Sequence, residues 1–320
     1  MTINKADLSI IIPAYNEEAS IAKTILQIRD ILKEAQLKAV EIIVVDDGST
    51  DKTYSAAISA QIEFQGALRL IRFRANRGYG AAIKAGLLAA QSDLVLITDA
   101  DLTYPAEEIP VFFKRAIAEQ LDMLVGARTG QTVHRQVLRQ IPKFILARLV
   151  NYVANEKVPD FNSGLRIFKR EIALRLLPIL PDGFSFTTTI TLAMIQNNYN
   201  VIFVPINYFK RAGKSKIRPI KDTIKFLRLI INMGLYFAPL KMFMPIGGLL
   251  FFLSVLVAVT SKLTTGKVAD VTSLTLAIAA LQLTALAFLA ELINHRSPRN
   301  DQNSASNMYH HDEQFRIRSD

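Results

Sequence analysis

The sequence predicts an α/β domain with a mostly parallel sheet, followed by an amphipathic interfacial helix and two transmembrane helices. As far as about Val204, short apolar runs alternate with amphipathic helical patterns. That order is typical of a parallel sheet covered by helices on both faces. A basic stretch follows Asn207, and two charge-free runs come after it. Each is about 20 residues long, the length that a helix needs to cross a bilayer core.

The expected strands are short apolar runs bounded by turn or polar residues. They cover residues 8–12, 41–45, 68–73, 94–98 and 123–125. Helical patterns lie between them, at residues 20–34, 51–61, 81–91 and 107–119. Because helical connections join parallel strands, we expect the carboxyl ends of these strands to meet at one edge of the sheet. Open α/β folds bind ligands at that edge.

A basic segment separates this domain from the apolar runs. Apolar residues recur there at helical spacing, and polar or basic residues mark the other face: Ile220, Ile224, Leu227, Ile231 and Leu235 against Lys221, Lys225, Arg228 and Asn232. Such a basic amphipathic helix is typical of a membrane interface. The alternative is a surface helix of a soluble protein.

The charge-free runs at 242–261 and 271–290 are predicted to be transmembrane helices joined by a short turn. A buried hairpin of a soluble domain is the alternative, but two such runs are rarely found there in tandem. Basic residues before the first run and after the second outnumber those in the turn, so the positive-inside rule places the domain in the cytoplasm. Thr, Ser and Gln side chains in the second run suggest contact with a partner helix or a homo-oligomer.

These features divide the chain into an α/β domain (1–210), a basic loop with a juxtamembrane helix (211–240), a two-helix anchor (241–294) and a polar cytoplasmic tail (295–320). The absence of cysteine excludes disulfides, thiolate metal sites and cysteine nucleophiles. The chain has 38 Lys and Arg against 28 Asp and Glu, a net charge of +10, which indicates an anionic partner. Nucleic acid is disfavoured because the basic cluster adjoins a membrane helix and lacks interleaved aromatic residues.

Acidic residues follow two of the expected strands. Asp46 and Asp47 come after the second, where they would accept hydrogen bonds from a base or a ribose. Gly48 and Asp51 also fit a turn and a helix cap. A glycine-rich turn at 76–80 opens the third helical pattern, and its backbone N–H groups would suit a phosphate.

Asp99 and Asp101 flank a single residue at the end of the fourth expected strand. Carboxylate oxygens placed in this way suit Mg²⁺ or Mn²⁺ that carries a diphosphate. The metal would neutralise the charge that develops on a leaving nucleoside diphosphate. The alternative interpretation of the pair is an ordinary turn.

Taken in order, these motifs resemble the GT-A fold, family 2 glycosyltransferases: Pro13-Ala14-Tyr15-Asn16-Glu17, Asp46-Asp47-Gly48-Ser49, residues 76–80 and Asp99-Ala100-Asp101. More narrowly, residues 7–293 resemble the branch of dolichyl-phosphate mannose synthases and polyprenyl-phosphate glucosyltransferases. Two further segments carry that resemblance, namely Asp160-Phe161-Asn162-Ser163-Gly164 and the basic loop Arg211-Ala212-Gly213-Lys214-Ser215-Lys216. In the bacterial members, a two-helix anchor similar to this one follows the domain.

The resemblance implies a role for each matching residue. The nucleotide-sugar pocket would be lined by Pro13, Tyr15, Glu17, Asp46 and Lys84. Asp99 and Asp101 would hold the diphosphate and metal, Arg128 a phosphate, and Asp160 would act as a base or position the sugar. The lipid phosphate would be received by Ser163, Arg211, Lys214, Ser215 and Lys216, with Arg135 and Arg139 as further candidates. Thr103 and Ala127 stand where relatives often have Gln and Ser.

The activity that the resemblance implies is inverting transfer of a hexose, with glucose from UDP-glucose favoured, to undecaprenyl phosphate at the cytoplasmic membrane face. A phosphate monoester has a second pKa of about 6, so the acceptor is largely a dianion at neutral pH and needs little help from a general base. Two alternatives stay open. One is mannosyl transfer from GDP-mannose to the same lipid, and the other is a non-catalytic protein that binds polyprenyl phosphate.

Overall fold

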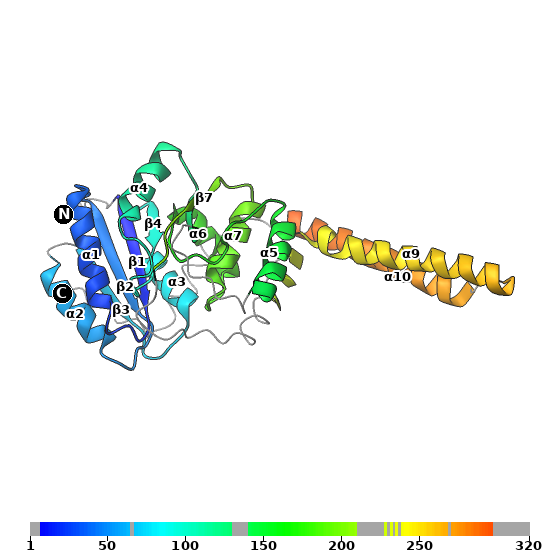
Figure 1. The fold of residues 1–320 in the computed structure, drawn as a ribbon, viewed down its shortest axis with the longest axis horizontal. Coiled ribbons are helices and arrows are strands. Elements are labelled where there is room, and N and C mark those ends of the chain that lie inside the picture. The colour runs from blue at the N-terminus through cyan, green and yellow to red at the C-terminus, as the bar shows by residue number, and fades with distance from the viewer. Residues whose placement is uncertain are drawn as a thin grey trace.

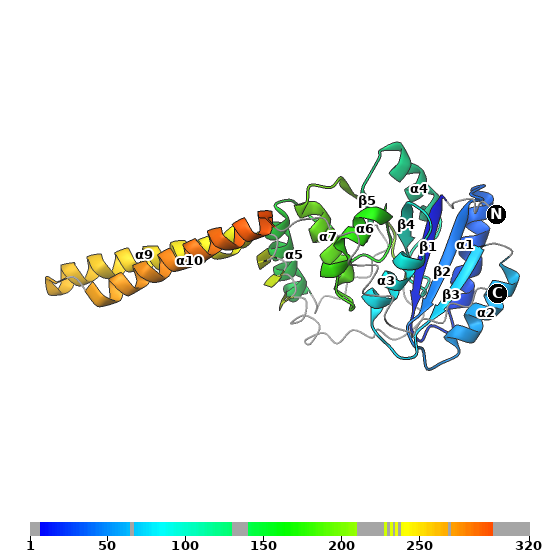
Figure 2. The same ribbon diagram turned by 180° about the vertical axis from the view of Figure 1, so that it is seen from behind.

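The structure, a computed structural model, describes residues 7–64, 67–129, 140–209, 238–267 and 270–296, together with six residues between 227 and 235. It consists of an α/β domain from which a long helical hairpin extends (Figure 1). The view from behind shows the same arrangement, with α5 (Gln140–Ala154) lying between the body of the domain and the hairpin (Figure 2).

A single seven-stranded sheet forms the centre of the domain. Its strands are β1 (Leu8–Ala14), β2 (Val40–Asp46), β3 (Ala67–Arg72), β4 (Leu94–Ile97), β5 (Met123–Ala127), β6 (Arg166–Lys169) and β7 (Val201–Pro205). They lie in the order β3-β2-β1-β4-β6-β5-β7. All described pairings are parallel except those of β6, which runs antiparallel to β4 and β5. The predicted mostly parallel sheet is therefore confirmed.

The helices that cover the sheet follow the strands in sequence. They are α1 (Ile21–Glu34), α2 (Thr53–Glu63), α3 (Tyr79–Ala89), α4 (Glu108–Ala118), α6 (Arg170–Leu176) with the short η2 (Leu177–Ile179), and α7 (Phe186–Gln196). All five predicted strands and all four predicted helices are confirmed, with their ends shifted by a few residues. The expected cap at α2 is partly realised, because the Asp51 carboxylate accepts a hydrogen bond from the Thr53 amide (2.9 Å).

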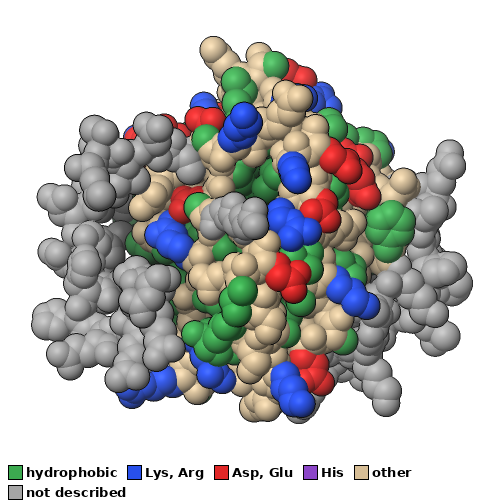
Figure 3. Space-filling view, turned by 90° about the vertical axis from the view of Figure 1, so that its left-hand side faces the viewer, with side chains coloured by type: hydrophobic (Ala, Val, Ile, Leu, Met, Phe, Trp, Pro, Cys, Tyr) green, Lys and Arg blue, Asp and Glu red, His purple; other side chains and the backbone are tan. Residues whose placement is uncertain are grey.

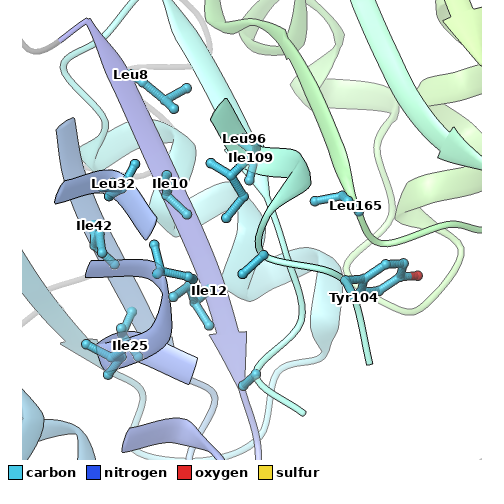
Figure 4. Packing of buried hydrophobic residues seen from close by; sticks show 14 of the residues in the cluster. Leu8, Ile10, Ile12, Ile25, Leu32, Ile42, Leu96, Tyr104, Ile109 and Leu165 are labelled. Carbon is cyan, nitrogen blue, oxygen red and sulfur yellow. The ribbon is translucent and has the colours of Figure 1, made fainter. Parts of the chain in front are cut away.

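The two faces of the sheet bury separate apolar layers because alternate residues of a strand point to opposite faces. Leu8, Ile10 and Ile12 of β1 pack toward α1 in the cluster of Figure 4. Ile11 points to the other face, where a Cβ at Gly86 of α3 would come within 2.6 Å of its side chain. Each fully buried isoleucine stabilises the fold by about 1.5–3 kcal/mol.

The antiparallel strand β6 decides which residues reach the functional edge. The carboxyl ends of the six parallel strands meet at one edge of the sheet. Because β6 runs the other way, its amino-terminal end lies at that edge. The residues just before Arg166 therefore stand beside those that follow β4 and β5. Sequence periodicity did not reveal this strand.

The hairpin consists of α9 (Pro239–Thr265) and α10 (Asp270–Arg296), each 27 residues long. At 1.5 Å per residue each helix is about 40 Å long, more than the roughly 30 Å of a bilayer core. By length and composition both helices are suited to cross a membrane, and only 11% of the apolar stretch of each helix is buried inside the protein. A hairpin in the core of a soluble domain would bury far more of this surface.

Polar and small residues line the contact between α9 and α10. The Ser254 hydroxyl donates a hydrogen bond to the Ser273 carbonyl oxygen (2.7 Å). A Cβ at Gly247 would lie 3.0 Å from the Thr284 hydroxyl. Ser273, through its backbone carbonyl, and Thr284, whose hydroxyl bonds within α10 to the Ala280 carbonyl (2.9 Å), therefore both lie against α9. Small residues of this kind let apolar helices approach closely. The homo-oligomer and the division at residues 210, 240 and 294 stay predictions.

The end of the domain away from the hairpin has a mixed surface. Among the described residues in Figure 3, Lys and Arg side chains are interspersed with Asp and Glu and with apolar side chains. On this face the described basic residues therefore form no continuous patch of the kind that binds nucleic acid. Most of the predicted basic segment at 211–240 lies outside the described residues; within it, Leu227, Ile231 and Leu235 are exposed.

Candidate active site

Two loops at the edge of β1 and β2 are joined by side-chain hydrogen bonds. The amide of Asn16 donates to the Ser49 hydroxyl (2.9 Å), and the amide of Glu17 donates to the Thr53 hydroxyl (2.7 Å). Asn16 has φ 52°, a left-handed conformation that asparagine tolerates. The predicted nucleotide ligands Pro13, Tyr15 and Glu17 therefore stand on a loop that is fixed against the loop following β2.

Asp46 is a buried carboxylate at the end of β2. Its side chain is 2% exposed, and Oδ1 accepts a hydrogen bond from the Ser49 amide (3.0 Å). Oδ2 lies 3.2 Å from Nε of Arg72 but has no well-aligned hydrogen-bond donor among the described residues. Arg72 thus compensates the charge of this carboxylate, and a ligand could bond to Oδ2 only if it reached this buried oxygen, so the contact of Asp46 with a nucleotide stays a prediction.

Asp47 has a different environment. Its carboxylate accepts hydrogen bonds from the amides of Arg77 (2.7 Å) and Gly78 (2.9 Å) and from the Asn76 side chain (2.9 Å). Burial raises the pKa of Asp47 and outweighs these hydrogen bonds, which lower it. The side chain thus holds the glycine-rich turn in place, and its proposed contact with a nucleotide would have to be made beside these bonds.

The glycine-rich turn packs against a distant loop. A Cβ at Gly80 would come within 2.1 Å of the Pro181 carbonyl oxygen, and the Ala81 amide donates to the Asp182 carbonyl (3.0 Å). Because the amides of Arg77 and Gly78 are bound by Asp47, these three N–H groups are occupied within the protein. A phosphate would therefore have to use other amides of the turn, and that role stays a prediction.

Gly80→Ala is expected to destabilise the domain by about 2 kcal/mol or more, because the added methyl group would collide with backbone that cannot easily move. Gly183→Ala is the matched control: a Cβ at Gly183 meets nothing within 4 Å. Urea unfolding of the two variants, compared with the original chain, measures the difference. Equal midpoints would contradict the packing described above.

Lys84 ties the same loop to α3. Its side chain is 9% exposed, and Nζ lies 2.8 Å from Oδ1 of Asp182. Lys84 was predicted to line the nucleotide pocket, and here its charge is compensated by the loop at residues 181–184. The ion pair between Lys84 and Asp182 therefore helps to hold this loop against the start of α3.

Asp99 and Asp101 follow β4 at the centre of the edge. Oδ1 of Asp99 accepts a hydrogen bond from the Tyr79 hydroxyl (3.2 Å). Asp101 is 8% exposed, and its Oδ1 accepts hydrogen bonds from the amide (3.2 Å) and the hydroxyl (2.6 Å) of Thr103. Thr103 thus orients Asp101.

The surroundings of these two carboxylates fit a divalent metal that is held together with a ligand diphosphate. A Cβ at Gly164 would lie 2.8 Å from Oδ1 of Asp99, so a larger residue at this position would collide with the carboxylate. No group of three or more His, Cys, Asp or Glu residues suited to a metal occurs in the described part of the chain. Mg²⁺ and Mn²⁺ are commonly bound by one or two carboxylates while substrate phosphates complete the coordination.

Arg128 and Asp160 form a bidentate ion pair at the ends of β5 and of the loop before β6. Nε and Nη2 of Arg128 donate to the two carboxylate oxygens of Asp160 at 2.7 and 2.9 Å, and the Arg128 amide donates as well (3.0 Å). The guanidinium also lies over the Tyr208 ring, 5.3 Å from its centre. Parallel N–H···O bonds of this kind are among the stronger side-chain interactions.

The ion pair sets the protonation of both partners. Burial by itself would raise the pKa of Asp160, but the Arg128 charge and hydrogen bonds outweigh burial and lower it below the usual 3.8. Burial alone would lower the pKa of Arg128, but the neighbouring Tyr104 and Asp160 outweigh burial and raise this pKa above its usual value. Asp160 is therefore a carboxylate at neutral pH and a weak base.

Ser163 and Arg166 lie behind this pair. Ser163 is fully buried, and its hydroxyl has no hydrogen-bond partner among the described residues. Its carbonyl oxygen accepts hydrogen bonds from Arg166, a fully buried arginine whose pKa burial lowers to about 10. A phosphate contact by Ser163 would require the loop to open, so that role stays a prediction.

The remaining predicted acceptor residues lie outside the described residues: Arg135, Arg139, Arg211, Lys214, Ser215 and Lys216. Sequence reasoning assigned no role to Tyr79, Asp182 or Arg166. Tyr79 and Arg166 belong to motifs that were recognised, so their polar side chains were a usable signal. Nothing local in the sequence indicates that Asp182 contacts α3.

Comparison with known proteins identifies the family. Residues 9–177 match the family described as glycosyl transferase family 2. A dolichyl-phosphate hexose transferase of Haloferax volcanii is 32% identical over 216 residues, which are 67% of this chain and 87% of that protein. A dolichyl-phosphate beta-glucosyltransferase of Dictyostelium discoideum is 27% identical over 72% of this chain and 74% of its own length.

The fold has counterparts among solved structures. Glucosyl-3-phosphoglycerate synthase from Mycobacterium tuberculosis, solved with Mn²⁺, UDP-glucose and phosphoglyceric acid, has a TM-score of 0.53 and 24% sequence identity. The match covers 72% of this chain and 79% of that one. With the acidic motif after β4 and the mostly parallel sheet in place, the chain belongs to glycosyl transferase family 2 and has its GT-A fold.

Proposed function

We propose that the protein is an inverting glycosyltransferase that moves a hexose from a nucleotide-sugar to polyprenyl phosphate at the cytoplasmic face of a membrane, with UDP-glucose and undecaprenyl phosphate as the favoured substrates. The observation that carries this proposal is the arrangement at the edge of the sheet. An acidic pair, Asp99 and Asp101, stands beside an arginine-bearing strand end in a domain that continues into an apolar hairpin.

The acidic side of the site would bind the donor. Asp46 at the end of β2, whose Oδ2 has an ion-pair partner in Arg72 but no aligned hydrogen-bond donor, would accept a hydrogen bond from the base or the ribose. Asp99 and Asp101 would hold Mg²⁺ or Mn²⁺ together with the diphosphate. The metal, when bound, supplies positive charge that stabilises the leaving nucleoside diphosphate. Thr103 and Tyr79 hold the two carboxylates in fixed orientations before any ligand arrives.

The basic side would bind the acceptor. A lipid phosphate is already a dianion near neutral pH, because its second pKa is about 6. Its oxygen attacks the anomeric carbon while the bond from that carbon to the diphosphate breaks, so the configuration inverts. Asp160, with its lowered pKa, is poorly suited to remove a proton. It would instead hold the Arg128 guanidinium, which remains charged, in position to attract the phosphate.

The hairpin would bring the site to the lipid. α9 and α10 have the length and composition of membrane spans, and relatives act on dolichyl phosphates by name. A polyprenyl chain remains in the bilayer while its phosphate lies at the interface. A catalytic domain anchored next to that interface would meet the phosphate without extracting the chain from the membrane.

Replacing Lys214 and Lys216 together with alanine is expected to raise the KM for lipid phosphate about tenfold, with little change in donor binding. The physical reason is the loss of two positive charges facing an anionic acceptor. Steady-state kinetics with varied acceptor in mixed micelles measures the effect. An unchanged acceptor KM would remove the basic loop from the acceptor site.

The proposal is tested with the full chain purified in detergent, undecaprenyl phosphate, Mg²⁺ or Mn²⁺, and either radiolabelled UDP-glucose or GDP-mannose. Label entering the lipid from UDP-glucose alone is the expected result. Label from GDP-mannose alone would retain the lipid acceptor and replace the sugar, in line with the broader hexose activity named for the Haloferax relative. Binding of undecaprenyl phosphate without transfer from either donor would favour the non-catalytic alternative.

A further inference from the structure

We propose that Tyr79 and the loop at residues 181–184 form a positioning device for Asp99, and that this device determines how tightly the site binds a nucleoside diphosphate with its metal. The inference rests on the proposed function, because it assigns the donor diphosphate to Asp99. It adds to the donor site the loop at residues 181–184, which is distant in sequence and contacts Tyr79, the residue that orients Asp99.

The device is a chain of two contacts that joins Phe184 to Asp99 through Tyr79. The Phe184 ring stacks on the Tyr79 ring, with centroids 5.7 Å apart and planes inclined by 14°. The Tyr79 hydroxyl donates a hydrogen bond to Oδ1 of Asp99 (3.2 Å). The loop therefore helps to fix the Tyr79 ring, and Tyr79 in turn fixes the carboxylate that is assigned to the metal and the diphosphate.

The loop is fastened to the amino-terminal end of α3 on two sides of Asp182. Its carbonyl oxygen accepts the Ala81 amide (3.0 Å), and its carboxylate pairs with the nearly buried Nζ of Lys84 (2.8 Å). Cβ atoms at Gly78 and Gly80 would lie 2.4 and 2.1 Å from carbonyl oxygens of Asp182 and Pro181. This close packing fixes the position of the loop, and with it the position of Phe184.

Phe184 is exposed to an extent that packing does not require. Its side chain is 61% exposed, whereas Phe186, two residues later, is fully buried in the core. An exposed phenylalanine leaves apolar area in contact with water, which is unfavourable. Its one aromatic contact among the described residues is the stack on Tyr79. The Phe184 side chain therefore packs against Tyr79 and is not part of the hydrophobic core.

Asp99 is confined from two directions. Tyr79 donates to Oδ1, and the backbone at Gly164 comes so close that a Cβ there would lie 2.8 Å from the same oxygen. A carboxylate held in one rotamer binds a metal–diphosphate complex without first losing side-chain entropy.

The test measures binding without turnover. Titration calorimetry of the full chain in detergent with UDP and Mn²⁺, and with GDP and Mn²⁺, identifies the tighter nucleotide. Tyr79→Phe keeps the ring and its stack but removes the hydrogen bond to a charged acceptor, so its affinity is expected to fall about tenfold. Phe184→Leu is expected to weaken binding about threefold, and Phe184→Tyr, which retains the stack, is expected to restore it.

Two matched controls lie away from this edge. Tyr199→Phe removes a hydroxyl just before the start of β7, and Ile62→Ala trims an exposed apolar residue of α2. Both are expected to bind like the original chain. In transfer assays Tyr79→Phe should raise the KM for the donor more than it lowers kcat. Unchanged nucleotide affinity in both Tyr79→Phe and Phe184→Leu would overturn the positioning role. Failure of the original chain to glycosylate lipid would overturn the proposed function and leave the binding result standing.

Discussion

Asp101→Ala is expected to lower the rate of transfer by a factor of about 100 to 1,000, which is the usual cost of removing one electrostatic contact to a developing charge. Asp101 lies at the ligand edge and is held by two hydrogen bonds from Thr103. The substitution removes the negative charge that would bind the metal and leaves Asp99 alone to do so. Initial rates at saturating donor and acceptor, measured in the same detergent, give the ratio directly.

Asp122→Ala is the matched control for this prediction. Asp122 pairs with Lys169 (2.7 Å) and accepts a hydrogen bond from the Asn200 amide (2.8 Å). It precedes β5 and therefore lies at the opposite edge of the sheet. Removal of the Asp122 carboxylate is expected to lower the stability of the fold slightly. The transfer rate should stay within about twofold of that of the original chain, because the ion pair lies far from the site and such surface pairs contribute little energy. If Asp101→Ala retained near-normal activity and a native circular dichroism spectrum, the metal assignment would be wrong.

Arg128→Lys is expected to reduce kcat/KM for the lipid phosphate about 100-fold, even though the charge is conserved. Lysine cannot reproduce the planar pair of bonds that Arg128 makes to Asp160, and the two side chains differ in how they bind phosphate. The variant is also expected to unfold more easily, by up to about 3 kcal/mol, because Asp160 would lose its bidentate partner within a largely buried site. Acceptor kinetics and chemical denaturation measure the two effects separately.

The pH dependence distinguishes a positioning role for Asp160 from that of a general base. The acceptor phosphate gains a proton below about pH 6, so kcat/KM should fall as the pH drops from 7 to 5. Because the pKa of Asp160 is lowered in the folded protein, its ion pair stabilises the fold above the ordinary aspartate pKa and loses this contribution only as the pH falls through the lowered value. Between pH 5 and 8, Asp160→Asn should therefore keep the same pH midpoint of activity. A shift of that midpoint in the variant would indicate that Asp160 itself titrates during catalysis.

Most of the sheet could be predicted because its strands are buried on both faces. Leu, Ile and Val make up four of the seven residues of β1 and five of the seven of β2, and this composition indicates a central strand of a parallel sheet. The polar residues that follow them then reach one edge by topology alone. For this reason the order of strands and helices along the chain is enough to predict that Asp46, Asp99 and Asp101 lie at the ligand edge.

The contacts that organise the site could not be predicted, since they join segments distant in sequence. β6 has only four residues and carries Arg166 and Lys169 at its ends, so neither its length nor its pattern indicates a strand. Helix α7 contains a run of threonines, whose β-branched side chains are weak helix formers. Arg128 and Asp160 were both recognised, but their pairing depends on the antiparallel insertion of β6.

The most direct test of the lipid-phosphate acceptor compares three acceptors under identical conditions with the better of the two labelled donors: undecaprenyl phosphate, undecaprenol and phosphoglyceric acid. Undecaprenol lacks the phosphate, and phosphoglyceric acid, which was present in the structurally similar synthase, lacks the lipid. We predict label in the organic phase with undecaprenyl phosphate and none with the other two acceptors. Efficient labelling of phosphoglyceric acid, or equal labelling of undecaprenol, would contradict a site that recognises a phosphate carried by a lipid.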